Sequence, residues 1–153
     1  LTPMFIIDSN ILVSEILTRY EKDELTLKYQ VFYQQISLIK RVISDFILNE
    51  FELYMVQVVP SRYQMEKEER KTIREITSVY IERMLKKCTL VSPSISAIKT
   101  AFDFYKQFGN THYISFTDSL LLAVAKENGY TILTKDRRLN ERAKDLRIKF
   151  YEL

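Results

Sequence analysis

The amino-acid sequence predicts an α/β domain built on a mostly parallel sheet. Short, continuous apolar runs such as Phe5–Ile7, which are typical of buried strands, alternate with longer segments whose apolar residues recur at helical spacing. Gly and Pro are scarce, with 2 and 3 copies in 153 residues, which excludes a linker-rich or disordered chain. A chain of this length buries one sizeable core, so we assign residues 1–153 to a single domain.

The first half of the chain alternates between predicted strands and helices. Residues 5–7 form the first strand, and Asp8-Ser9-Asn10 favours the start of a helix over residues 11–19. A second helix ends near residue 40, where residues 41–43 form a short strand. Ser44-Asp45 then begins a third helix, which Pro60 interrupts. We expect its buried stripe to contain Ile47, Phe51, Tyr54, Met55 and Val58.

The second half repeats this alternation. A long amphipathic helix begins near residue 66, with an apolar face of Ile73, Ile76, Tyr80 and Met84. Residues 89–91 are extended, and Ser94 is the expected N-cap of a helix whose buried stripe is predicted to be Ile95, Ile98, Phe102 and Tyr105. A helix over 117–128 has Gly129 as its C-cap and precedes a strand at 131–133. Residues 148–151 alternate as a last strand near a sheet edge.

Four acidic residues occupy positions at which open α/β sheets bind ligands. Asp8 and Asp136 directly follow predicted strands, and ligands bind beyond the carboxyl ends of such strands. Asp118 lies in the first turn of its helix, and Glu50 lies at the border of an apolar stripe. If the topology brings these helix faces to the same edge of the sheet, four carboxylates meet there.

Each of these acids also has a simpler interpretation. Asp8 alone is more often a helix cap than a ligand, Asp118 complements a helix dipole, and Asp136 suits a turn. An arginine partner would satisfy Glu50 as well as a metal would. The occurrence of all four favours the shared site over these separate explanations.

A cluster of carboxylates requires a cation, because neighbouring negative charges raise one another's pKa. Oxygen ligands select Mg²⁺ or Mn²⁺, whereas structural zinc favours Cys and His, of which the chain has one each. Such an ion lowers the pKa of a bound water and offsets charge on a phosphoryl oxygen, which suits phosphodiester hydrolysis. Cys88 is interpreted as buried packing and His112 as a loop residue, and no catalytic triad is predicted.

Three segments, residues 5–10, 44–50 and 116–136, resemble the PIN-domain family, and the resemblance covers nearly the whole chain. It implies a three-layer α/β/α fold and a nuclease that uses Mg²⁺ or Mn²⁺. By motif, its catalytic and metal-binding acids correspond to Asp8, Glu50, Asp118 and Asp136. The family pattern also carries supporting polar residues, which correspond to Ser9, Asn10 and Thr134.

The charge distribution is consistent with an RNA-facing surface. The chain has 23 basic and 20 acidic residues, and sequestering four acids in a pocket leaves the remaining surface more basic. Basic residues cluster beside Asp136, and we predict that they bind RNA phosphates: Lys135, Arg137, Arg138 and Arg142. A solvated helix face is the alternative explanation of this cluster.

The leading hypothesis is therefore a metal-dependent endoribonuclease. The resemblance implies 5′-phosphate and 3′-hydroxyl products, a homodimer and, as in VapBC pairs, a toxin with an antitoxin partner. One alternative is a PIN-fold module that binds RNA or protein without turnover. Another is a phosphoaspartyl enzyme that uses Asp8, although Asn10 stands where such phosphatases carry a second Asp. A single cysteine, no visible signal sequence and no long apolar run predict a cytoplasmic protein without a membrane segment.

Overall fold

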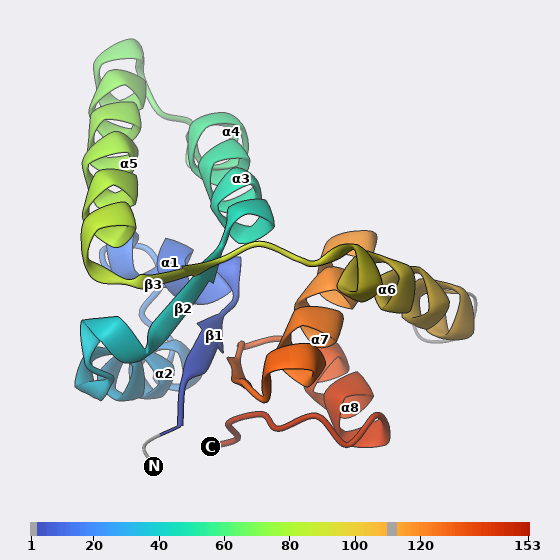
Figure 1. Ribbon diagram of the computed structural model, residues 1–153. Helices are drawn as coiled ribbons and strands as arrows, with labels where there is room; N and C mark the ends of the chain where they lie inside the picture. The colour runs from blue at the N-terminus through green and yellow to red at the C-terminus, as the bar shows by residue number, and fades with distance from the viewer. Residues whose placement is uncertain (1–2, 110–112) are drawn as a thin grey trace.

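The computed structural model describes residues 3–109 and 113–153, so the prediction for His112 lies outside the described residues. Its centre is a parallel sheet of four strands in the order β3-β2-β1-β4. The strands are β1 (Phe5–Ile7), β2 (Arg41–Ser44), β3 (Thr89–Val91) and β4 (Thr131–Leu133). Figure 1 shows α1, α3 and α5 on one side of the sheet and α7 and α8 on the other. The predicted three-layer α/β/α class is confirmed.

The register of the sheet places the ends of β1 and β4 side by side. Ile6 pairs with Val42 on one side and with Ile132 on the other, and Ile7 pairs with Leu133. The chain continues this pairing by one further bond, because the Asp8 amide donates to the Leu133 carbonyl over 3.0 Å. The residues that follow β1 and β4 therefore lie side by side, at the carboxyl ends of these strands.

The predicted strand over residues 148–151 does not form as a strand. Only an isolated parallel bridge joins Phe150 to Ile132, outside the edge strand β4. The backbone of Arg147 has a φ of 58° and turns the chain just before this point, so that only a short stretch runs beside β4.

The helical segments of the first half lie between residues 9 and 62. They are α1 (Ser9–Ile16), α2 (Glu24–Gln35), the 3₁₀ turn η1 (Leu38–Lys40), α3 (Asp45–Leu53), the π-helical segment η2 (Tyr54–Val58) and α4 (Val59–Arg62). The Asp8 carboxylate accepts a hydrogen bond from the Ser9 amide, so α1 starts two residues earlier than predicted. The predicted break near residue 40 and the short strand after it are both present.

The π-helical segment corrects two predictions in this region. Met55 and Val59 are fully buried, whereas Val58 is 44% exposed and Tyr54 only half-buried. A π turn contains more residues than an α turn, so the buried face advances by four residues to Val59 instead of three to Val58. The helix also continues through Pro60 to Arg62, because a proline is tolerated where the regular hydrogen-bond ladder is already broken.

The helices of the second half are α5 (Lys67–Lys87), α6 (Ile95–Phe108), α7 (Phe116–Asn128) and α8 (Arg137–Asp145). Reciprocal hydrogen bonds between Glu66 and Glu69 cap the start of α5, as expected near residue 66. On α5, Ile73, Thr77 and Met84 are buried, whereas the predicted Ile76 is 42% exposed. Cys88, which follows α5, is half-buried instead of fully buried.

Helix α6 turns its predicted core stripe outward. Its buried residues are Ala97, Ala101, Phe104 and Phe108, and it packs mainly against α7. The predicted residues are exposed instead, with exposed fractions of 74% for Ile95, 43% for Ile98, 51% for Phe102 and 40% for Tyr105. The two alanines allow the backbones of α6 and α7 to approach closely, so the side with small residues becomes the packing face.

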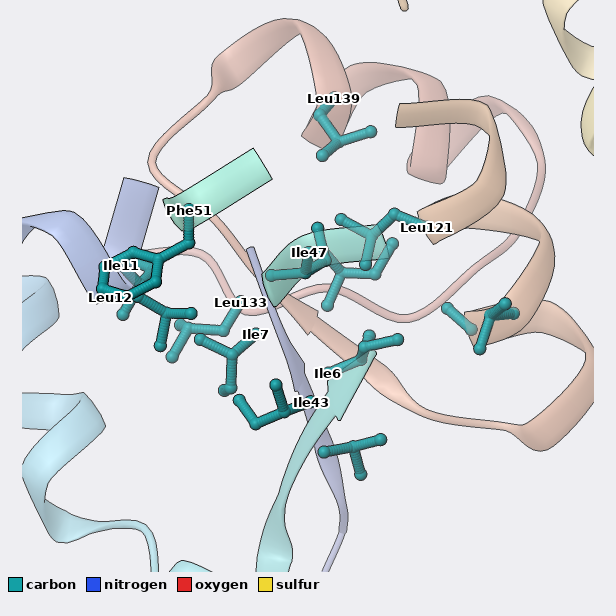
Figure 2. Close-up of a cluster of buried hydrophobic side chains, with 14 of the residues drawn as sticks. Ile6, Ile7, Ile11, Leu12, Ile43, Ile47, Phe51, Leu121, Leu133 and Leu139 are labelled. Atoms are coloured by element: carbon teal, nitrogen blue, oxygen red, sulfur yellow. The ribbon is translucent and has the colours of Figure 1, made fainter. Parts of the chain in front are cut away.

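The hydrophobic core joins the sheet to the helices that carry the predicted site. Figure 2 shows strand residues of this core together with residues from α1, α3, α7 and α8, and those labelled there are fully buried: Ile6, Ile7, Ile11, Leu12, Ile43, Ile47, Phe51, Leu121, Leu133 and Leu139. Because these side chains interdigitate, the first turns of the helices have fixed positions relative to the strand ends. Within the described residues, none of the helices combines the length and apolar character needed to cross a bilayer.

Candidate functional site

Asp8 lies at the junction of β1 and α1 and is held by three neighbours. Its side chain is only 5% exposed. One carboxylate oxygen, Oδ1, accepts from the Ser9 amide over 2.7 Å. The other, Oδ2, accepts from the Thr134 hydroxyl over 2.7 Å and from the Asn10 amide group over 3.3 Å. Both oxygens are thus oriented by residues that directly follow the neighbouring strands β1 and β4.

Burial raises the pKa of Asp8 from 3.8 to about 7. The hydrogen bond from Thr134 opposes this increase, and the negative charges of Asp118 and Glu50 add to it. Those two carboxylates therefore lie within electrostatic range of Asp8, although they come from distant parts of the chain. A cation among these groups would favour the ionised form of Asp8.

Glu50 reaches the same edge of the sheet from α3. It is half-buried at the margin of the apolar stripe, as the sequence predicted. The Ser9 hydroxyl donates a hydrogen bond to Glu50 Oε1, and this bond ties α3 to the first turn of α1. Ser9 therefore has a double role, because its amide donates to the capping carboxylate of Asp8 and its hydroxyl orients Glu50.

Asp118 takes part in the capping box of α7 as its third residue, and Ser115 is the N-cap. Its amide donates to Ser115 Oγ over 3.0 Å, and its Oδ2 accepts from the Ser115 amide over 3.1 Å. Burial raises the pKa of Asp118, the Ser115 bonds lower it, and the charges of Asp136 and Glu50 raise it again. The sequence did not single out Ser115, although its spacing from Asp118 matches a capping box.

Asp136 completes the cluster as the N-cap of α8. Its Oδ1 accepts from the Arg138 amide over 2.9 Å, and its own amide donates to Thr134 Oγ1 over 3.0 Å. The side chain is half-buried. The structure thus confirms the local capping role of this residue. The charge of Asp136 raises the pKa of Asp118, so these two carboxylates lie within electrostatic range of each other.

The four carboxylates fit a hard divalent cation by their chemistry. They supply only oxygen ligands. Among the described residues, none of the ion pairs joins one of these four acids to a Lys or Arg side chain. Across residues 3–109 and 113–153, no three acidic, His or Cys side chains converge closely enough to enclose an ion. Mg²⁺ does not require such an enclosure, because it is commonly held by one or two carboxylates and keeps several waters.

Asn10 and Thr134 connect the carboxyl ends of the neighbouring strands β1 and β4. The Asn10 side-chain amide donates to Thr134 Oγ1 over 3.0 Å, and its Oδ1 accepts from the Lys135 backbone amide over 3.1 Å. Thr134 is fully buried, and its hydroxyl donates a hydrogen bond to Asp8. The polar residues that the sequence predicted as supporting thus form one continuous hydrogen-bonded network beneath the acids.

The predicted phosphate-binding cluster divides into two exposed and two engaged residues. Arg137 and Arg138 are exposed at the start of α8. Lys135 is ion-paired with Glu21 at 3.4 Å, with 18% of its side chain exposed. The Arg142 side chain is 9% exposed, is ion-paired with Asp145 at 3.3 Å and lies over the Phe108 ring. Lys135 and Arg142 are therefore engaged by acidic residues of the chain itself, whereas Arg137 and Arg138 are the exposed members of the predicted phosphate-binding cluster.

Comparison with known proteins identifies the family. A family model, described as PIN domain, matches residues 5–145 of the chain. The chain belongs to the PIN-domain family, which confirms the resemblance seen in the sequence. A search of curated proteins gives no match.

Solved structures share the fold at low sequence identity. FitAcB from Neisseria gonorrhoeae is 17% identical, with 97% of each chain covered and a TM-score of 0.69. VapC20 from Mycobacterium tuberculosis, described as a toxin that cleaves the sarcin–ricin loop, is 11% identical over 90% of this chain and 94% of that one, with a TM-score of 0.63. VapBC2 from Rickettsia felis, bound to a promoter DNA fragment, is 14% identical over 97% of each chain, with a TM-score of 0.59.

Proposed function

We propose that this PIN domain is a divalent-metal-dependent endoribonuclease, and the toxin of a toxin–antitoxin pair. The observation that carries the proposal is the buried Asp8, whose pKa is raised to about 7 beside the charges of Asp118 and Glu50. A site that gathers carboxylates at such an electrostatic cost is suited to hold a cation. The similarity to the VapC and FitAB structures adds support for the toxin class.

The proposed ligands are Asp8, Glu50, Asp118 and Asp136, with Mg²⁺ or Mn²⁺ as the ion. When bound, such an ion supplies Lewis acidity toward a phosphodiester. The chain itself supplies orientation: Thr134 and Asn10 hold the Asp8 carboxylate, and Ser9 holds Glu50. Arg137 and Arg138, both exposed beside Asp136, are the proposed contacts to RNA phosphates that flank the cleaved bond.

A cleavage assay tests this proposal directly. The purified chain is incubated with a set of labelled structured RNAs in Mn²⁺, in Mg²⁺ and in excess chelator. We expect cleavage products with 5′-phosphate and 3′-hydroxyl ends in both metals and none in chelator. RNA binding without cleavage in any divalent ion would contradict the proposal and favour a non-catalytic PIN-fold binding module.

We further propose that the chain forms a homodimer through the outer face of α6. The four exposed residues there are Ile95, Ile98, Phe102 and Tyr105, and the Tyr105 ring packs edge-on against Phe116, which is itself 39% exposed. Contiguous exposed apolar side chains of this kind mark interaction sites, and a helix face of uniform apolar character can pair with its own copy about a two-fold axis.

An antitoxin partner is proposed from the neighbours and from a separate groove. The similar structures include VapBC2 and FitAB complexes that are bound to DNA. In this chain, a groove of about 510 Å³ between the end of α1 and α5 has an apolar floor that includes Leu17, Met65 and Ile73. The test is to co-express this chain with a small protein that a neighbouring gene encodes and to purify the complex. The cleavage assay then measures whether the bound protein suppresses RNA cleavage.

A further inference from the structure

Lys135 occupies a distinctive place between two residues of the acidic site. Thr134, directly before it, bonds to Asp8, and Asp136, directly after it, belongs to the acidic cluster. The Lys135 side chain turns away from solvent, because its ammonium Nζ lies 3.4 Å from Glu21 Oε2 and donates to Thr26 Oγ1 over 3.1 Å. Both partners come from the region in which α1 connects to α2, more than 100 residues earlier in the chain.

The two partners of Lys135 are themselves held in place. Glu21 accepts a second hydrogen bond over 2.5 Å from Ser14, which is 1% exposed. Thr26 is 2% exposed and donates its hydroxyl to Asp23 over 2.8 Å. The Lys135 ammonium therefore meets two acceptors whose positions are fixed by α1 and α2, which is the condition under which a largely buried ion pair determines geometry.

The backbone of Lys135 is held from the opposite direction. Its amide donates to Asn10 Oδ1 over 3.1 Å, and the same Asn10 side chain donates to Thr134 Oγ1. The turn from Thr134 to Asp136 is thus anchored to α1 through the backbone and to the α1–α2 connection through a side chain. Loss of either anchor would free the peptide unit that carries the Asp136 carboxylate.

We infer that Lys135 is a positioning residue for the acidic site: its ion pair with Glu21 and its bond to Thr26 hold the Thr134–Asp136 turn. The inference rests on the proposed function, because it assigns Lys135 a task at that metal site. It replaces the expectation that Lys135 binds RNA phosphate, and it gives Glu21 a role in a site from which it is distant in sequence.

The test compares Lys135→Met with Glu21→Gln, each of which breaks the pair from one side. The readout is the affinity of the purified protein for Mn²⁺ in the absence of RNA, measured by titration calorimetry and by the electron spin resonance of free Mn²⁺. We expect both substitutions to weaken Mn²⁺ binding by about 10-fold, the range found when groups that orient metal ligands are removed. Lys144→Met, at an exposed position of α8, is the matched control and should leave the affinity unchanged.

The paired design separates positioning from simple charge. Removing a cation near the acids would strengthen Mn²⁺ binding, and removing an anion would weaken it, so an electrostatic effect alone would move the two variants in opposite directions. Loss of positioning weakens both. The charge-reversed double variant Lys135→Glu with Glu21→Lys should bind Mn²⁺ more tightly than Lys135→Glu alone, and the conservative Lys135→Arg should stay within about 3-fold of the parent.

RNA kinetics supply the result that would overturn the inference. If Lys135→Met binds Mn²⁺ normally but raises KM for RNA and lowers the salt dependence of RNA binding by about one charge, Lys135 is a phosphate contact instead. Should Lys135→Met not fold, as judged by circular dichroism, unchanged Mn²⁺ affinity of Glu21→Gln would equally refute the role. Failure of the parent protein to bind Mn²⁺ at all would refute the proposed function, which is a distinguishable outcome.

Discussion

The edge of the sheet that carries the acids and the outer face of α6 are constructed in opposite ways. At the sheet edge, polar groups are buried and have partners within the chain: Asp8 accepts from Ser9, Asn10 and Thr134. On α6, large apolar groups such as Phe102 are exposed, and α6 packs through its other side. Burial of a polar group requires a partner, whereas exposure of an apolar group favours one. The first region is therefore organised within one chain, and the second is suited to association.

The largest expected effect comes from replacing the central acid. Asp8→Asn removes the negative charge but keeps the size of the side chain, so we expect RNA cleavage at saturating Mg²⁺ to fall by at least about 1,000-fold, or about 4 kcal/mol in activation free energy. Rate constants from single-turnover gels measure the change. Cleavage by Asp8→Asn at the parent rate would show that the acidic edge is not the reactive site.

The corresponding change on α6 should affect assembly without affecting chemistry. Phe102→Glu places a charge in the middle of the apolar stripe, and we expect the dimer dissociation constant to increase by about 100-fold or more, because burying an unpaired carboxylate is costly. Light scattering coupled to size-exclusion chromatography measures the oligomeric state. Gln57→Glu, which adds a charge at an exposed position of η2, is the control. A parent protein that is monomeric at all concentrations would contradict the proposed dimer.

The raised pKa of Asp8 predicts how stability depends on pH. In the unfolded chain the carboxyl has its ordinary pKa of 3.8, whereas in the folded metal-free protein the pKa is about 7. The folded state therefore binds more protons between these values, and its free energy of unfolding falls as pH rises from about 4 to about 7, by roughly 4 kcal/mol at most from this group.

Urea denaturation of the metal-free protein across this pH range measures the effect. The Asp8→Asn variant should lose less stability over the same range, since its amide does not titrate. Mg²⁺ favours the ionised carboxylate, so it should stabilise the parent more at pH 8 than at pH 5. Equal pH profiles for the parent and the variant would show that folding does not raise the pKa of Asp8.

The smallest expected effect concerns the two exposed arginines beside the site. Substituting Arg138 by Ala should weaken RNA binding by about 3- to 10-fold and reduce its salt dependence by about one charge. Arg142→Lys, at a buried position, should leave that salt dependence unchanged and affect stability instead, because Arg142 is engaged with Asp145 and Phe108. Fluorescence anisotropy at several salt concentrations distinguishes the two residues. A salt dependence that responds to Arg142 but not to Arg138 would reverse the assignment.

Much of this architecture could be predicted because local patterns dictate it. The apolar runs before Asp8 and Asp136 indicate the strands, and the polar residues after them indicate helix starts, because side chains such as that of Asp8 cap backbone amides. The order of the acids along the chain, combined with the rule that ligands bind at strand carboxyl ends, was enough to nominate the site. The supporting residues Ser9, Asn10 and Thr134 follow the same local logic.

Local patterns failed where two faces of one element compete for the interior. On α6 the larger apolar stripe was predicted to be buried, but the side with Ala97 and Ala101 packs against α7, because close approach of two helices depends on small side chains. On η2 a single wider turn moved burial from Val58 to Val59. Periodicity detects an amphipathic helix, but the neighbouring element decides which face it covers.

What the sequence determined by itself is the four central strands, most of the helices and several of their caps, since these depend on residues close together along the chain. It also predicted the four acids as one site. Only the tertiary structure decided that Lys135 bonds to Glu21, that Arg142 is buried and that the α6 stripe is exposed. Each of those outcomes depends on which distant segment of the chain packs against the residue. The physical reason is that a charged or apolar side chain takes the best partner available in space, and sequence spacing does not specify that partner.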